Sequence, residues 1–433
     1  MTEEIRTYNL TEMQMYMYGG HRLGLGQACL LCGSAIVEGE CDISEMQRAA
    51  NEIVRINDSL RTRITEENGK PVQRFIPFRE REFEVLHFNS FEELDRYGEK
   101  YGQEVLEIDD EHDLFELKLV KMPGAYGAIL KIHHIISDAW TVMLIGNQFF
   151  RILKGETVEA YSFGEHVESE AAFKSTKRFE KGKAFFREEK ARLNEKTLLS
   201  KKPLISKKGK SIEYEFSEEE TAEIRDYIKN HNVTGYDIFS AATAIWMSRE
   251  LRRDLFYVGS VVLNRTGIRE KNSTGMYVNS TPILLECDMD ASFADNTASV
   301  SRSMLASLRH EKSGATEFGL REMPYDVWIS YEAARLDAAP DARCQMYYCG
   351  AHGVVMIFTL VDRGTGNLRI RYGYNVKYPD KSANRMLTEV PRILLEGIRD
   401  DSISAGEILN RIDGENESSN KSKLSFRNIL KKK

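Results

Sequence analysis

The chain has no long apolar segment. None of its 433 residues belongs to a run of about 18 consecutive apolar residues, which excludes a transmembrane helix of ordinary length. Its first residues, Met1-Thr-Glu-Glu-Ile-Arg6, lack the basic and apolar regions of a secretory signal. We therefore expect a cytoplasmic protein.

Cysteine is also scarce, with six residues in all. Cys29 and Cys32 have the C-x2-C spacing of a zinc knuckle or a redox pair. No second C-x2-C is present to complete a zinc site, and the pair lies in an apolar run that predicts a buried strand. We expect reduced core thiols and no bound metal, with a zinc site as the alternative.

An excess of positive charge is missing, and so is any internal repeat of fixed short period. The net charge of −7 argues against a nucleic-acid-binding protein. Residues 174–210 are rich in lysine, but glutamate is interleaved with it through much of the segment. This pattern favours a solvated helix and a linker over a nucleic-acid-binding patch.

The chain is longer than one hydrophobic core usually spans. Its two halves each show strands and helices in mixed order with hairpins, which predicts an α/β fold of the α+β sandwich type. We expect an N-terminal lobe over 1–173, a helix and linker over 174–210, and a C-terminal lobe over 211–405. We expect residues 406–433 to form a disordered basic tail, with a membrane or partner anchor as a weaker alternative.

The most informative segment is Lys131-Ile-His-His-Ile-Ile-Ser-Asp-Ala-Trp140. Residues 128–136 predict a buried strand, on which His133 and His134 would point to opposite faces. Ser137 or Asp138 could cap the apolar helix that follows. An imidazole titrates near neutral pH, so His134 is a candidate general base. Asp138 could orient that imidazole or form a buried ion pair elsewhere.

This segment resembles the H-H-x-x-x-D-G motif of the condensation domains of nonribosomal peptide synthetases, which belong to the chloramphenicol-acetyltransferase-like superfamily. Ala139 replaces the motif's glycine, which adds a Cβ to a tight approach and disfavours a positive φ. Other segments resemble the family's motifs in the same order: Thr11 to Tyr18, Leu60-Arg61-Thr62, Tyr161 to His166, Val258 to Arg265, and Met276 to Ser280.

The resemblance implies two chloramphenicol-acetyltransferase-like lobes in a V-shaped pseudo-dimer, with a central tunnel. It makes His133, His134 and Asp138 the catalytic motif, with His134 as the base or positioner and the other two as supports. Asp138 would pair with Arg265, or with Arg61 as a second choice. Further positions that could contact the tunnel or the substrate are Ser137, Trp140, Asn279 and Ser280.

The same resemblance implies acyl transfer from a thioester carried on phosphopantetheine, with no bound cofactor. Since the sequence shows no carrier or adenylation domain, we expect an acyl or peptidyl carrier protein to act in trans on a monomer. Amide formation with an amine acceptor is our first hypothesis. The alternatives are ester formation with an alcohol, from a carrier or coenzyme A thioester, and a non-catalytic recruitment module.

Overall fold

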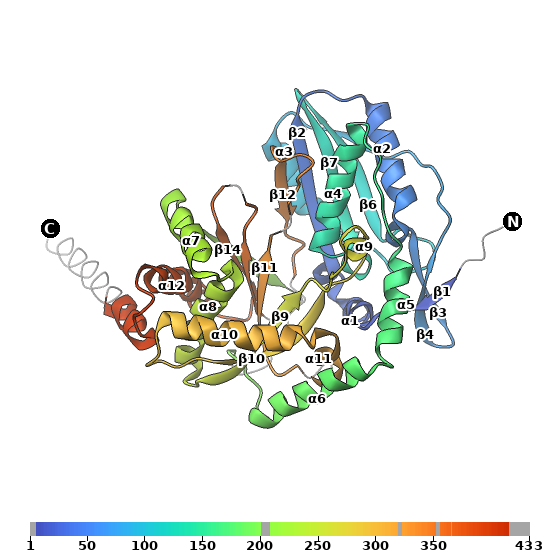
Figure 1. The fold of residues 1–433 in the computed structure, drawn as a ribbon. Helices are drawn as coiled ribbons and strands as arrows, with labels where there is room; N and C mark the ends of the chain where they lie inside the picture. The colour runs from blue at the N-terminus through green and yellow to red at the C-terminus, as the bar shows by residue number, and fades with distance from the viewer. Residues whose placement is uncertain are drawn as a thin grey trace, which may run out of the picture.

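The computed structural model describes residues 6–200, 208–318, 323–333, 335–351, 356–364 and 366–414. Two lobes face each other, each built on its own β-sheet (Figure 1). In the described ranges, no helix combines the length and the apolar character needed to cross a bilayer.

A five-stranded sheet forms the N-terminal lobe, in the order β12-β2-β7-β6-β5. The strands are β2 (Leu30–Glu38), β5 (Val85–His87), β6 (Phe115–Met122), β7 (Ala125–His133) and β12 (Arg343–Tyr347). Alternation along β7 puts Leu130 and Ile132 in one core with α2 (Ile43–Ile56) and α4 (Ala139–Leu153). Ile129 points to the opposite face and packs with α3 (Phe91–Tyr101).

Strand β12 is supplied by the second half of the chain. Its residues fall within the range that the sequence assigns to the C-terminal lobe, yet they pair antiparallel with β2, with Tyr347 opposite Cys32 (Figure 1). Arg343 donates to both carboxylate oxygens of Asp95 on α3, and the Tyr347 hydroxyl bonds to Ser34. The lobes therefore exchange structure, and the predicted boundary at 211 does not separate their sheets.

A small three-stranded sheet lies beside the N-terminal lobe, in the order β1-β4-β3. Its strands are β1 (Thr7–Asn9), β3 (Thr62–Glu67) and β4 (Lys70–Phe75). Helix α1 spans Glu12–Gly20 and begins there because Thr11 caps it in a capping box with Gln14. Residues 21–25 and 26–29 continue as short π and 3₁₀ turns.

A six-stranded sheet forms the C-terminal lobe, in the order β10-β9-β11-β13-β14-β8. Its strands are β8 (Gly209–Glu215), β9 (Leu255–Val262), β10 (Asn279–Glu286), β11 (Val327–Glu332), β13 (Met356–Val361) and β14 (Arg369–Asn375). One face packs against α7 (Glu218–His231), α8 (Gly235–Leu251), α10 (Phe293–Leu308) and α12 (Asp380–Arg399). Alternate residues such as Trp328, Thr359 and Arg371 point to the other face, toward the first lobe.

The remaining helices are α5 (Phe163–Phe173) and α6 (Lys177–Arg192), which run from the first lobe to the second, α9 (Ile268–Lys271), and α11 (Glu311–Phe318) (Figure 1). Helix α6 lies in the stretch predicted as a solvated helix and linker, of which residues 201–207 lie outside the described ranges.

The disordered tail predicted from residue 406 is wrong for its first part. Residues 405–414 are helical, and Ala405, Ile408, Leu409 and Ile412 are buried in the core of the C-terminal lobe. Their spacing of three and four residues puts them on one helical face, so burial of that face holds the segment in place. Residues 415–433 lie outside the described ranges.

Contact between α3 and β12 gives a test of the strand exchange. A Cβ at Gly98 would lie 2.3 Å from Cζ of Tyr347. In an open helix Gly→Ala stabilises by about 1 kcal/mol, but here the clash should lower the free energy of unfolding by about 1–3 kcal/mol. Urea denaturation of Gly98→Ala measures this. Gly19→Ala on α1 is the matched control, because no atom lies within 4 Å of its added Cβ. Equal stability of the two variants would contradict the packing of β12 on α3.

Candidate active site between the lobes

The histidine motif forms a turn rather than the end of a strand. Strand β7 ends at His133, and residues 134–136 form a single 3₁₀ turn, so the predicted strand to Ile136 is three residues too long. Side-chain bonds explain the difference. Nδ1 of His133 accepts a hydrogen bond from the Ile135 N–H at 3.0 Å, and the Ser137 hydroxyl donates to the His133 carbonyl at 3.0 Å.

His133 is fully buried and supports this turn. Because Nδ1 accepts from Ile135, a neutral ring carries its proton on Nε2, which lies 3.3 Å from Nδ1 of His21. Burial lowers the pKa of His133 well below 6.5, and the neighbouring His21 and His134 lower it further. His133 is therefore neutral near pH 7 and is not among the residues that line the cavity between the lobes.

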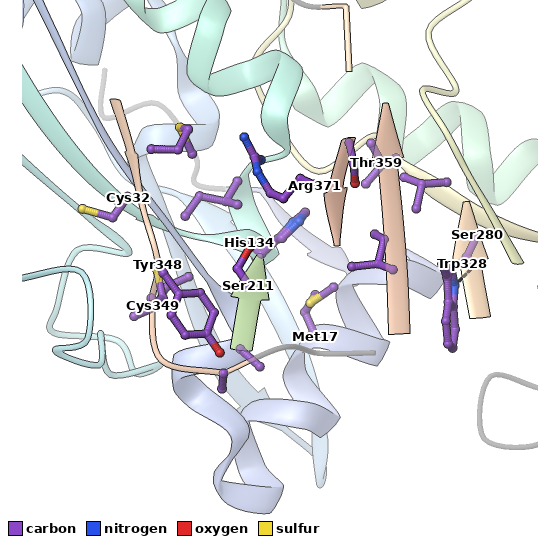
Figure 2. A pocket seen from close by; sticks show the side chains of 18 of the residues that line it. Met17, Cys32, His134, Ser211, Ser280, Trp328, Tyr348, Cys349, Thr359 and Arg371 are labelled. Atoms are coloured by element: carbon purple, nitrogen blue, oxygen red, sulfur yellow. Dashed lines mark hydrogen bonds between the residues drawn. The ribbon is translucent and has the colours of Figure 1, made fainter. Parts of the chain in front are cut away.

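His134 points the other way, into that cavity (Figure 2). Its Nδ1 lies 3.1 Å from Sδ of Met276, a residue of the second lobe. Burial lowers the pKa of His134 below 6.5, although the Asp138 carboxylate and hydrogen bonds to the backbone at His134 and Ser137 act in the opposite direction. The imidazole is therefore unprotonated near neutral pH and able to accept a proton.

Both lobes contribute to the cavity, which has a volume of about 1140 Å³. Apolar side chains form part of its lining, among them Met17, Met276 and Trp328. Arg371 and Thr359 lie on the strands of the second lobe that form the facing wall (Figure 2). A void of this size exceeds the volume of about 300–1,000 Å³ typical of small-molecule pockets.

Asp138 and Arg265 form a buried ion pair across the lobe boundary. Both side chains have 0% exposure, and Nη2 of Arg265 lies 3.1 and 3.0 Å from the two carboxylate oxygens. Asp138 also accepts from the Thr141 N–H at 2.7 Å, as the cap of α4, and from the N–H groups of Tyr277 and Val278. The ion pair predicted between Asp138 and Arg265 is confirmed by these contacts.

The partners of Arg265 explain how it is held. Its Nη1 donates to the carbonyls of Glu270 and Ser273, and its guanidinium lies 3.9 Å from the centre of the Tyr277 ring. Arg61, the second choice for pairing with Asp138, instead donates to the backbone carbonyls of residues 54, 55, 57 and 76.

A second polar link lies beside the ion pair. The Thr274 hydroxyl, from the second lobe, donates to Oδ1 of Asn57 at 3.1 Å and lies 2.6 Å from the Ser59 hydroxyl. Asn57 in turn donates to Oε1 of Gln148 on α4 at 2.7 Å. All four side chains are buried, so water does not compete for the hydrogen bonds that join the two lobes.

Ala139 does not create the crowding that its Cβ suggested. It is the first residue of α4, it is exposed, and it is absent from the non-glycine residues with a positive φ. The position therefore accepts a side chain without strain.

The four positions predicted to contact the tunnel or substrate divide into two pairs. Asn279 and Ser280 line the cavity. Ser137 is buried beneath the turn, and Trp140 donates its Nε1–H to the Lys271 carbonyl at 2.9 Å; neither of them lines the cavity.

The two C-x2-C cysteines are free thiols in this structure. Burial raises the pKa of the Cys29 thiol to about 11, which leaves it protonated near neutral pH. Among the described residues, no cluster of three potential metal ligands is present.

Sequence reasoning missed Gln14 as a positioning residue. Its Nε2 donates to the Ile135 carbonyl at 2.9 Å, within the histidine turn, and also to Gln73. In the sequence, Thr11-x-x-Gln14 has the pattern of a capping box, which the structure also shows. The sequence gives no signal for this role, because the burial of Gln14, which requires several hydrogen-bond partners, is seen only in the structure.

Removal of the Asp138 carboxylate tests the ion pair. Asp138→Ala leaves the Arg265 guanidinium buried without a counterion, and should lower the free energy of unfolding by about 3–5 kcal/mol. Chemical denaturation followed by circular dichroism measures the loss. Glu165→Ala is the control, because Glu165 pairs with Arg269 at an exposed site and its loss should cost less than about 1 kcal/mol. Similar losses in the two variants would contradict a special role for the buried pair.

Comparisons with known proteins agree with this geometry. The sequence profile of the family described as Condensation domain matches residues 4–320. Surfactin synthase subunit 1 of Bacillus subtilis (strain 168) is 26% identical over 300 residues, which cover 65% of this chain and 8% of the synthase. Bacitracin synthase 2 of Bacillus licheniformis is 21% identical over 316 residues, 70% of this chain and 12% of the synthase. The chain thus spans about a tenth of the length of these relatives.

Solved structures share the fold. The first condensation domain of the calcium-dependent antibiotic synthetase superposes with a TM-score of 0.81 at 17% identity, covering 93% of this chain and 98% of that domain. The X-domain from teicoplanin biosynthesis gives a TM-score of 0.77 at 13% identity, covering 92% and 96%. These matches confirm the predicted α/β fold of the chloramphenicol-acetyltransferase-like type.

Condensation domains are acyltransferases that form amide bonds in nonribosomal peptide synthesis. The profile matches well over half of the chain, and the interlobe cavity presents the histidine turn that the motif predicts. This chain belongs to the condensation domain family of nonribosomal peptide synthetases.

Proposed function

We propose that this chain is a condensation-type acyltransferase that joins a carrier-bound acyl or aminoacyl thioester to an amine acceptor. The observation that carries the proposal is His134, an unprotonated imidazole at the wall of a cavity lined by both lobes. A general base near neutral pH requires this state and this access to substrate.

In the proposed reaction, His134 carries the proton from the acceptor nitrogen to the leaving group. The acceptor nitrogen attacks the thioester carbonyl carbon, so that a C–N bond forms and the C–S bond breaks. The proton lost by the nitrogen passes to His134 and then to the departing thiolate, which leaves amide and free thiol. Since Nδ1 of His134 faces Met276, Nε2 is the ring atom left for this transfer.

Two features favour a thioester on a pantetheine arm as the donor. The cavity volume of about 1140 Å³ gives room for such an arm together with an acceptor. A starter condensation domain of rhizomide synthetase, which shares the fold with a TM-score of 0.81 at 16% identity over 92% of this chain and 96% of that chain, is described in complex with C8-CoA and Leu-SNAC. In our proposal the carrier protein acts in trans, and the chain itself holds no cofactor.

His134→Ala tests the proposed base. The variant should lower kcat by about 10²–10⁴-fold, because the acceptor nitrogen loses its proton acceptor. Product formation is followed with acyl and aminoacyl thioesters, on a carrier protein or coenzyme A, and with amine and alcohol acceptors. The control is His231→Ala on the surface helix α7, which should react at the unaltered rate. Unchanged turnover by His134→Ala would refute the proposed base, and faster reaction with alcohols would assign ester formation.

The pH dependence gives an independent check. Since burial lowers the pKa of His134 below 6.5, the unprotonated form of the ring predominates at pH 6.5 and above. With an acceptor amine of low pKa, kcat/KM should be flat near neutral pH and should fall only as the pH drops through the lowered pKa. An acid limb with an apparent pKa clearly above 6.5 would contradict this assignment.

A further inference from the structure

The cavity has two chemically different regions. Met276 lies against His134, but the wall formed by β13, β14 and β8 carries polar groups. Pairing puts Thr359 opposite Arg371, and Arg371 opposite Glu213, in one row across three strands. Since residues opposite each other in a sheet share a face, the three side chains stand together on the wall.

Arg371 is held in place by ion pairs, but part of its guanidinium group is free to donate hydrogen bonds. Its Nε donates to Oε1 of Glu213 at 2.8 Å, and its Nη1 lies 3.4 Å from Oε2 of Glu332. Among the described residues, Nη2 of Arg371 has no hydrogen-bond partner. The side chain is 29% exposed and lines the cavity (Figure 2), so its free edge is available to a bound molecule.

Two neighbours of Arg371 also carry atoms that are free to form hydrogen bonds. Oε2 of Glu213 and the hydroxyl of Thr359 have no hydrogen-bond partner within the described part of the chain, and both residues line the cavity. Gly373 follows on the same face of β14 and carries no side chain, which leaves space beside the guanidinium. The free Nη2 donor of Arg371 and the free Oε2 acceptor of Glu213 thus lie side by side.

Charge on this wall selects the kind of group that fits. Three arginines and three glutamates lie on or beside this wall. Arg371 pairs with Glu213 and Glu332, Arg369 pairs with Glu215, and Arg363 donates to the Cys344 carbonyl. The wall therefore has no excess charge with which to attract a carboxylate or an ammonium group. A neutral group that both accepts and donates a hydrogen bond matches it, and an amide is such a group.

We propose that Arg371, Glu213 and Thr359 form a recognition subsite for an amide group of the substrate. The amide carbonyl accepts from Nη2 of Arg371 and from the Thr359 hydroxyl, and its N–H donates to Oε2 of Glu213. This inference rests on the proposed function for the identity of the bound molecules, and it makes Arg371 a specificity-determining residue. It predicts that an amide-bearing substrate is favoured over an aliphatic molecule of the same shape.

Matched substrates test the subsite. N-acetylglycyl and 4-methylpentanoyl thioesters of ethanethiol have a similar shape, and only the first carries an amide; the methyl esters of asparagine and leucine form a similar pair of acceptors. In at least one of the two pairs, the wild-type protein should favour the amide-bearing member by about 10- to 100-fold in kcat/KM, the range expected for a hydrogen bond to a charged group. Arg371→Met should reduce that preference to within about threefold.

Two further variants keep the test decisive if Arg371→Met fails to fold. Thr359→Val keeps the shape of the side chain and should weaken the preference, and Arg371→Met with Glu213→Gln removes one charge of each sign. Arg399→Met, which breaks the exposed pair of Arg399 with Glu223 at 2.9 Å, is the control and should retain the preference.

A binding measurement separates this inference from the proposed function. The same molecules, in which a ketone replaces the thioester, are titrated into His134→Ala by calorimetry with and without Arg371→Met. Selective binding that depends on Arg371, without turnover by the wild type, would keep the subsite and overturn the proposed reaction. Turnover with no preference in either pair, or a preference that persists in Arg371→Met, would overturn the subsite.

Discussion

The buried pair between Asp138 and Arg265 is the contact on which the site depends. It joins the residue that caps α4 to a loop of the second lobe, and neither side chain reaches solvent. A charge removed from water is stable only when its partners are fixed, and here backbone N–H groups and carbonyls complete the bonding on both sides. The same contact therefore sets the lobe boundary and the end of the histidine turn.

The position of the histidine turn at the cavity follows from this contact between the lobes. His134 lies four residues before Asp138, and Gln14 holds the Ile135 carbonyl from the opposite side. The turn is thus anchored at both ends while its one cavity-facing imidazole stays free of strong hydrogen bonds to other side chains. Burial of that imidazole keeps it unprotonated, since the Asp138 carboxylate is already saturated by Arg265 and cannot fully offset the loss of hydration.

The sequence allowed much of this to be predicted, and the reasons differ from residue to residue. A helix cap is a local feature, so the sequence limited the cap of α4 to Ser137 or Asp138, and the structure has Asp138 there. The pairing of Asp138 with Arg265 came from the family resemblance. Strand β12 escaped prediction because Arg-Cys-Gln-Met-Tyr has no clear alternation and gains its register only from the edge of β2. Arg371 escaped it because the cavity wall is assembled from distant strands.

The exchange of β12 has a consequence for synthesis on the ribosome. Strand β2 is complete when residue 38 has been made, but the strand that covers its outer edge comes about 300 residues later. During that interval the first lobe presents an open strand edge, which is a template for pairing with other chains. An unpaired strand edge of this kind makes the incomplete chain more prone to aggregate than the finished fold.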